Sequence, residues 1–447
     1  MDIVIMVAQL ILALAILVSL HEWGHYITAR SFGIRVEKFY IFFDAWGKKI
    51  FSKKINGTEW GIGWLPLGGY VKISGMIDES LDKDQMGTAP EAHEFRSKPA
   101  WQRLIVMIGG VTVNLILGFL IFAMMLFYYG DEYIPNSAVV NGSGISLTEI
   151  GKKTELHNGD KVVRVNGDTV VKFKDLTSPD YLMAEHLSYT VLRNGSELEI
   201  AIPDSIGKQI KESKGMPLFS YRYEPIVLKV QKKSNASKGG LKKDDRVVGV
   251  DTLDVQYFDE LTDILQTKKS QSISLAVLRE GKRMNLPMDV TAEGTLGFEL
   301  NSELAYGDKT VKVAYGFFES FPAGVNKGMN ILLTQIKGFG QLITGKINPA
   351  KSVMGPIQMT KLFGADWDWK NFWRITGVLS LILAFMNLLP IPALDGGHVV
   401  FLLLEMITGK PLSEKVMYVF QIIGMIILFG LMAFVFGVDI FSIFTGN

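Results

Sequence analysis

The sequence contains no cysteine, almost no net charge and only six histidines in 447 residues. Without cysteine there are no disulfides, no iron–sulfur clusters and no thiolate zinc sites. Lys and Arg number 46 and Asp and Glu 45, which gives a net charge of +1. Nucleic-acid-binding proteins normally carry a basic excess, so we expect no nucleic-acid partner. A hydrophobic content of 48% with 20% charged residues also excludes wholesale disorder.

Charge is absent from four long stretches, residues 3–20, 104–129, 375–394 and 416–438. A helix needs about 20 residues to cross a bilayer, so each stretch predicts a transmembrane helix. The first stretch has neither the basic start nor the cleavage site of a signal peptide, and we expect it to be retained. The sequence therefore predicts a polytopic α-helical membrane protein. Its four spans are placed at 1–31, 101–129, 372–408 and 411–445.

The placement of Lys and Arg predicts the orientation of these helices. None precedes Arg30 and none follows Lys415, whereas seven lie between residues 30 and 54. The link between the last two spans carries Lys410 and Lys415. Because basic residues concentrate in cytoplasmic links, residues 32–100 and this short link are expected in the cytoplasm. Both termini and the large middle segment then lie on the other side.

The middle segment contains an internal repeat. Residues 158–166 match residues 243–251 at an offset of 85, and 191–195 match 277–281 at an offset of 86. Each unit has a polar turn, an alternating strand, a short helix and a further strand. The units resemble PDZ domains of the protease-associated bacterial kind, predicted at 130–221 and 222–306. Such domains often bind an extended peptide as an added strand, but spacers or size filters fit the sequence equally well.

Two further segments are neither clean spans nor parts of the repeat. Residues 58–75 combine Gly, Pro, Trp and Tyr with apolar alternation, which favours strands and turns over a helix. They fit a membrane-reentrant β element or a surface hairpin, because non-helical backbone at membrane depth needs protein or water to satisfy it. Residues 307–371 contain apolar faces broken by Gly and Pro, which indicate amphipathic helices at the interface.

The first predicted span ends in His21-Glu22-Trp23-Gly24-His25. Residues i and i+4 share one face of a helix, so His21 and His25 can bind one metal ion. Glu22 is then placed to orient and deprotonate a metal-bound water. Ionisable groups in a membrane helix are costly and are functional by default. The alternative is that this group is merely the polar cap of a membrane helix.

A catalytic zinc site normally uses three protein ligands, and Asp395 is the best third candidate. It ends the third charge-free stretch at a depth similar to that of His21, whereas the other histidines have polar surroundings or no partner at i+4. Pro390 and Pro392 should bend or break the helix before it. Two asparagines, Asn387 and Asn114, fit either a substrate contact or a hydrogen bond between helices.

Together these motifs resemble the site-2 protease family of intramembrane zinc metalloproteases. The resemblance rests on the HEWGH motif, LPLGGYVK at 65–72, the tandem repeat and NLLPIPALDGGH at 387–398. It implies that His21, His25 and Asp395 bind Zn²⁺ and that Glu22 is the general base. It places residues 65–72 in a reentrant β element near the site. The expected substrate contacts are Gly68, Gly69, Asn114, Asn387, Pro390 and Pro392.

The resemblance also implies a bacterial inner-membrane location, with PDZ domains and termini in the periplasm and the site near the cytoplasmic side. The expected substrates are single-span membrane proteins, namely anti-sigma factors and remnant signal peptides. Two rival functions remain open on the sequence alone. One is a membrane-anchored peptide-binding scaffold with a structural metal. The other is a metal transporter, which is disfavoured because the ligands sit at one depth and no polar series traces a path.

Overall fold

The computed structural model describes residues 2–66, 68–76, 90–182, 184, 186–212, 217–300, 309–345, 348–349 and 354–445. The chain forms two compact units. The first comprises Met1–Gly130, Ala314–Gly340 and Val353–Asn447, and the second comprises Asp131–Val313 and Gln341–Ser352. In the order of the sequence, the residues of the second unit thus interrupt those of the first.

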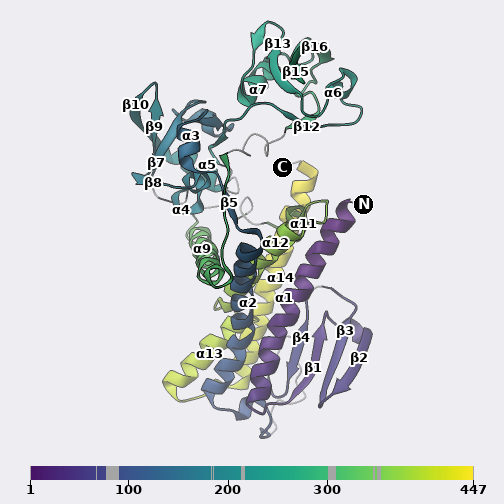
Figure 1. Cartoon of the computed structure of the whole chain (residues 1–447). Coiled ribbons are helices and arrows are strands. Elements are labelled where there is room, and N and C mark those ends of the chain that lie inside the picture. Colours follow the sequence, from purple (N-terminus) through teal and green to yellow (C-terminus); the bar gives the residue numbers. More distant parts are fainter. Residues whose placement is uncertain are drawn as a thin grey trace. The chain divides into compact units, whose positions relative to one another are not determined.

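Four helices in the described part of the chain are long and apolar enough to cross a membrane, as predicted. They are α1 (Asp2–Ser31), α2 (Ala100–Tyr129), α12 (Trp369–Leu388) and α14 (Glu414–Thr445), and all four belong to the first unit (Figure 1). The third, α12, is 20 residues long and ends six residues before the end of the charge-free stretch 375–394 that predicted it. Helix α12 ends at Leu388 and is capped by Leu389. A separate helix, α13 (Asp395–Thr408), begins six residues after this cap. Pro390 and Pro392 cause this break, because proline lacks an amide hydrogen and clashes with the preceding turn.

Glycines allow the helices of the first unit to approach closely. A Cβ on Gly24 of α1 would lie 2.4 Å from the carbonyl oxygen of Gly109 on α2. A Cβ on Gly118, further along α2, would lie 2.5 Å from the Leu381 side chain of α12. Small residues at such crossings are the usual means of packing helices in membranes, where apolar burial provides little drive for association. Helix α2 thereby packs against both α1 and α12.

Two more helices are α9 (Phe317–Ile343), which belongs to this unit up to Gly340, and α11 (Pro356–Phe363). Gly324 of α9 lies against the backbone of Ala123 on α2. Helix α11 packs on α1, where the Gln9 amide donates to the carbonyl oxygen of Gly364 at 3.2 Å. Both helices fall in the region predicted to hold amphipathic helices.

The first unit also contains a four-stranded sheet with the order β2-β3-β1-β4. The strands are β1 (Val36–Ile41), β2 (Lys49–Ile55), β3 (Thr58–Gly63) and β4 (Tyr70–Ile73), and η1 (Ala45–Gly47) and η2 (Phe95–Ser97) are short 3₁₀ turns nearby. Strands β1 and β3 are parallel, and the other pairs are antiparallel. Phe39, Val71 and Ile73 bury this sheet against Ala29 of α1 and Val106 of α2. The strands and turns expected over 58–75 are thus present, with Leu67 outside the described residues.

The second unit contains two four-stranded sheets with matching strand order. The first is β10-β9-β7-β8, formed by β7 (Lys161–Val165), β8 (Asp168–Thr169), β9 (Leu187–Arg193) and β10 (Ser196–Ile202). The second is β14-β13-β15-β16, formed by β13 (Arg246–Val250), β14 (Leu253–Asp254), β15 (Ser272–Arg279) and β16 (Lys282–Asp289). Written from its other edge, the first sheet has the order β8-β7-β9-β10. These strands correspond one by one to β14-β13-β15-β16, so the two sheets have the same topology.

Short helices and two-stranded ribbons complete this unit. The helices are α3 (Asn136–Val140), α4 (Pro179–Leu182), α5 (Asp204–Glu212), α6 (Asn235–Lys238) and α7 (Phe258–Thr267), with 3₁₀ turns η3 (Gly151–Lys153) and η4 (Phe173–Thr177). The ribbons pair β6 (Ile145–Leu147) with β11 (Phe219–Tyr221), β12 (Val227–Val230) with β17 (Phe298–Leu300), and β5 (Asp131–Tyr133) with β18 (Val311–Val313). The last ribbon pairs the two ends of residues 131–313.

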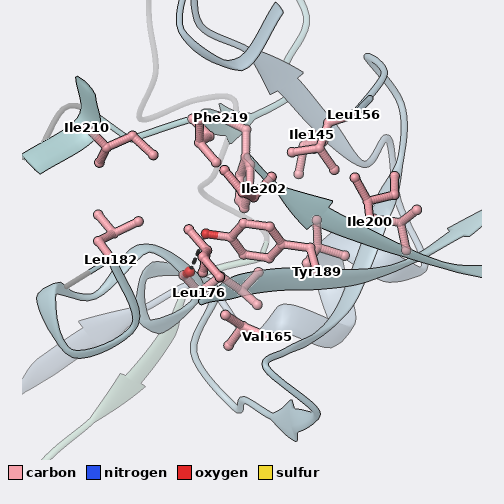
Figure 2. Packing of buried hydrophobic residues seen from close by; sticks show 14 of the residues in the cluster. Ile145, Leu156, Val165, Leu176, Leu182, Tyr189, Ile200, Ile202, Ile210 and Phe219 are labelled. Carbon is pink, nitrogen blue, oxygen red and sulfur yellow. Dashed lines mark hydrogen bonds between the residues drawn. The ribbon is translucent and has the colours of Figure 1, made fainter. Parts of the chain in front are cut away.

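Each sheet has its own apolar core. In the first, Tyr189 is fully buried among aliphatic side chains such as Leu176 and Ile202, and Figure 2 shows its ring at the centre of this cluster. Its hydroxyl donates to the carbonyl oxygen of Leu176 at 3.0 Å, which satisfies the only polar atom of the side chain. The second core contains Val247, Leu275 and similar residues and is separate from the first.

A buried ion pair occupies the same place in both sheets. Asp160 accepts hydrogen bonds from Arg193 at 2.6 and 2.7 Å, and Asp245 accepts two from Arg279 at 2.7 Å. Asp245 has no exposed surface. Burial alone raises the pKa of Asp245, but the Arg279 hydrogen bonds and the amide hydrogen bond from Lys242 outweigh it and leave the pKa below its usual value of 3.8.

We predict that the stability of the second sheet depends on pH through Asp245. Its lowered pKa means that the folded state favours the carboxylate, so the stabilisation is full above pH 3.8 and is lost as the pH falls further. Hydrogen exchange of β13 and β15 amides over this range measures the effect. In Arg279→Met the protein should be less stable at neutral pH and should show a weaker acid dependence. An equal acid dependence in that variant would contradict this role of the pair.

Candidate metal centre

Helix α1 places two histidines of the HEWGH motif on one buried face. His21 and His25 are one turn apart, and their exposed fractions are 8% and 6%. Glu22 lies in the same turn and is half-buried. Trp23 lies off this face and is exposed, whereas Gly24 is buried against Gly109 of α2. The helix therefore presents two imidazoles together, with a carboxylate beside them.

Asp395 meets both histidines at the start of α13. Its Oδ2 lies 3.1 Å from Nε2 of His21 and 3.3 Å from Nε2 of His25, and the two Nε2 atoms are 3.2 Å apart. A tetrahedral zinc ion with bonds of about 2.0–2.1 Å holds its ligand atoms about 3.3 Å apart. The three atoms thus form a triangle with the edge lengths of one face of a zinc tetrahedron.

The chemistry of these three groups also suits zinc. Oδ2 of Asp395 is buried and accepts no hydrogen bond within the described residues, and the amides at the start of α13 favour its negative charge. Imidazole nitrogens and a carboxylate oxygen are common zinc ligands, and three of them leave a fourth position for water or substrate. Within the part of the chain that the structure describes, this trio is the cluster that could hold a metal ion.

The remaining ring nitrogens have partners that fit this arrangement. Nδ1 of His25 lies 2.9 Å from the carbonyl oxygen of Val106, and Nδ1 of His21 lies 3.3 Å from the side-chain amide of Asn114. When Nε2 binds metal, Nδ1 carries the hydrogen and needs an acceptor. The Val106 carbonyl is one. Asn114 supplies the other when its amide is turned so that Oδ1 faces the ring; this oxygen is buried and has no hydrogen-bond partner among the described residues.

Helix α2 contributes a glycine that sequence reasoning missed. A Cβ on Gly110 would lie 2.4 Å from Nε2 of His25 and 2.7 Å from Cε1 of His21. Any side chain at this position would therefore occupy the space where the imidazoles meet. Adjacent Gly109 and Gly110 in an otherwise apolar stretch were the available signal.

The loop between α12 and α13 is tightly folded. The Ile391 amide donates to the carbonyl oxygen of Leu389 at 2.7 Å, and the Leu394 amide to that of Ile391 at 3.0 Å. Ala393 has a φ of 82°, which is unusual for a residue with a side chain. A Cβ on Gly396 would lie 2.2 Å from the Leu389 carbonyl oxygen, so only glycine fits there. This fold turns Asp395 toward the histidines.

The other residues predicted to contact substrate lie at different places around the trio. Nδ2 of Asn387 is 3.3 Å from Nε2 of His21, whereas Pro390 and Pro392 lie in the loop. Gly69 packs against the Tyr40 carbonyl and the Val18 side chain, near His21 on α1. Gly68 has a φ of 151° and lies beside the Phe43 ring. None of the remaining histidines, His93, His157, His186 and His398, belongs to the described metal cluster.

Comparison with known proteins identifies the family of this arrangement. The model of the peptidase family M50 matches residues 9–431. The chain belongs to peptidase family M50, the site-2 protease family. It is 30% identical to the regulator of sigma-E protease RseP of Escherichia coli over 98% of both chains. It is 28% identical to the regulator of sigma E protease of Haemophilus influenzae, covering 95% of this chain and 96% of the relative.

A third relative, from Neisseria meningitidis, is provisionally named a zinc metalloprotease and is 29% identical over 96% of this chain and 97% of its own. The M50 chain is thus a zinc metalloendopeptidase. Zinc follows from the family, and the cluster of His21, His25 and Asp395 offers a place for it. The four apolar helices and the similarity to RseP are consistent with an inner-membrane protein.

We predict that each purified chain binds about one zinc ion and that both His25→Ala and Asp395→Ala lower this content sharply. Removing one of three ligands leaves too few donors for tight binding. Atomic absorption of protein dialysed against a weak chelator measures it. The matched control is His398→Ala, which alters a histidine three residues after Asp395 on α13 and should retain zinc. Full zinc content in Asp395→Ala would exclude Asp395 as a ligand.

Proposed function

We propose that this M50 enzyme hydrolyses peptide bonds within or beside the transmembrane segments of single-span membrane proteins. The observation that carries the proposal is the triangle of Nε2, Nε2 and Oδ2 atoms with edges of 3.1–3.3 Å. Both Nε2 atoms belong to α1, a helix that is long and apolar enough to cross a bilayer. His21, His25 and Asp395 hold the metal ion, and Glu22 is the general base. Ionisable groups in a membrane helix are costly to bury, so their presence there favours a functional role.

The residues of the site divide the reaction between them. Zinc held by His21, His25 and Asp395 would supply Lewis acidity for the polarisation of the scissile carbonyl and the activation of water. Glu22, adjacent to His21, takes a proton from the attacking water and delivers it to the leaving amine nitrogen. The Val106 carbonyl and Asn114 hold the two imidazoles in the orientation that keeps both Nε2 atoms toward the metal. The Asn387 amide, close to His21, is placed to donate to the substrate.

A transmembrane substrate must be unwound before hydrolysis, because its peptide bonds are shielded by helical hydrogen bonding. The sheet near α1 and the broken segment before Asp395 both offer backbone groups for an extended chain. Gly69 lies between Tyr40 and Val18, where a side chain would not fit, so the backbone of this segment can approach α1 closely. Gly68, Pro390 and Pro392 are the further candidates for contact with the extended substrate.

Substrate access is assigned to the two sheets of the second unit. Their common strand order and the repeat at an offset of 85–86 support two tandem PDZ domains at 130–221 and 222–306. The termini and these domains lie in the periplasm. There the domains exclude bulky proteins or bind a peptide end exposed by an earlier cleavage. The regulators of sigma E named above suggest an anti-sigma factor as one substrate, with remnant signal peptides as another.

Glu22→Gln tests the proposed reaction. The amide cannot accept the proton, and we expect cleavage of a single-span test substrate in vesicles to fall by about 10²–10⁴-fold. Zinc content should stay at the wild-type level because no ligand is removed. The matched control is Glu319→Gln on α9, outside the site, which should cleave normally. Undiminished cleavage by zinc-loaded Glu22→Gln protein would refute the role of Glu22 and favour a scaffold whose metal is structural.

A further inference from the structure

Helix α14 is attached to the first unit through few buried positions. Among its described side chains only Gln421, Gly424 and Asp439 are buried, and none of these is a large apolar residue. Ile426 and Phe429, by contrast, are 67% and 61% exposed. The helix supplies none of the three metal ligands. Its place in the unit therefore depends on a small number of specific contacts.

The closest of these contacts joins Gly424 to the loop before Asp395. A Cβ on Gly424 would lie 1.7 Å from the carbonyl oxygen of Pro392 and 2.1 Å from its carbonyl carbon. Real Cβ atoms essentially never approach other atoms within 3.0 Å. The neighbour is backbone, so no rotation of a side chain relieves the overlap. Gly424 thus allows direct contact between the backbone of α14 and the loop, of the Cα–H to carbonyl type.

Pro392 lies three residues before Asp395, within the loop that separates α12 from α13. Neither Pro390 nor Pro392 has an amide hydrogen to donate, so the loop has few backbone hydrogen bonds of its own. Its internal hydrogen bonds join residues two or three positions apart, from the Ile391 amide to Leu389 and from the Leu394 amide to Ile391. The position of the loop therefore depends on what packs against it from outside.

A second contact fixes α14 along its own axis. Oδ2 of Asp439 accepts a hydrogen bond from the Ile357 amide at 2.8 Å, at the start of α11. A Cβ on Gly355 would lie 2.2 Å from the same oxygen. Asp439 is 15 residues beyond Gly424, which is about four helical turns, so both residues lie on one face. Helix α14 cannot slide past the loop without breaking the contact between Asp439 and α11.

We propose that Gly424 is a positioning residue for the metal centre: it seats the backbone of α14 against Pro392 and so holds Asp395 at the distance that zinc requires. The inference rests on the proposed ligand set of His21, His25 and Asp395. A methyl group at 424 forces the loop and the helix apart by more than about 1 Å, and displacements of this size in a catalytic constellation cost about 10²-fold in rate.

Gly424→Ala tests the proposal, with Gly430→Ala and Gly437→Ala as matched controls. The control glycines are on the same helix, and a Cβ at either position would meet nothing within 4 Å. We expect Gly424→Ala to release zinc to a chelator about 10–100-fold faster and to lower kcat with little change in KM. Both controls should match the wild type in zinc release and kinetics.

Thermal unfolding separates positioning from packing. Positioning predicts a melting temperature for zinc-free Gly424→Ala close to that of the zinc-free controls. Two results would overturn the proposal. One is that Gly424→Ala protein is unfolded to the same extent as it has lost zinc, and the other is that it releases zinc at the wild-type rate. Zinc release needs no substrate and wild-type zinc content is measured separately, so failure here is distinct from failure of the protease assignment.

A double-mutant cycle tests the same contact from the loop side. Pro392→Gly alone should speed zinc release, because it loosens the loop. Once the loop is loose, it can move away from a methyl group at 424, so Gly424→Ala should add less in the Pro392→Gly background than in the wild type. Strictly additive effects on the rate of zinc release would show that the two residues act independently and would contradict the proposed contact.

Discussion

The structure of this M50 protease depends on bringing three buried polar atoms within 3.3 Å of one another among apolar helices. Polar groups in such surroundings lose hydration and are stable only when they are paired or bind a cation. Nε2 of His21, Nε2 of His25 and Oδ2 of Asp395 have no room between them for a side chain. Every nearby element must therefore either supply a partner for these groups or stay out of their way.

Glycines let the neighbouring helices pack beside the three atoms without a side chain entering the space that these atoms occupy. Gly110 leaves the volume next to both imidazoles free, and Gly24 and Gly109 let α1 and α2 approach closely enough for this to happen. Gly396 lets the loop before Asp395 fold back on itself. A glycine in a helix interior costs about 1 kcal/mol relative to alanine. That cost is offset here by contacts that no larger residue permits.

Motifs with a fixed local geometry were predictable from the sequence. His21 and His25 at i and i+4 on a charge-free helix require one shared face, and two prolines before Asp395 require a break in the helix. The four apolar helices followed from length and absence of charge. Packing partners were not predictable in this way. The contacts of Gly110 with the imidazoles and of Asn114 with His21 join α1 to residues more than 80 positions away, and a single sequence carries no signal for which helix faces pair.

The break before Asp395 explains why the proposed third ligand lies at a helix start and not within a continuous helix. Within a straight helix, a carboxylate side chain follows the direction set by its turn, and the backbone around it is fully hydrogen-bonded. At the first residue of α13, the same carboxylate gains the favourable charge of the helix start, and the preceding residues keep carbonyl groups free of helical bonds. One interruption thus serves both needs of the proposed intramembrane reaction: it turns the proposed ligand toward the histidines, and it leaves backbone groups that an extended substrate can pair with.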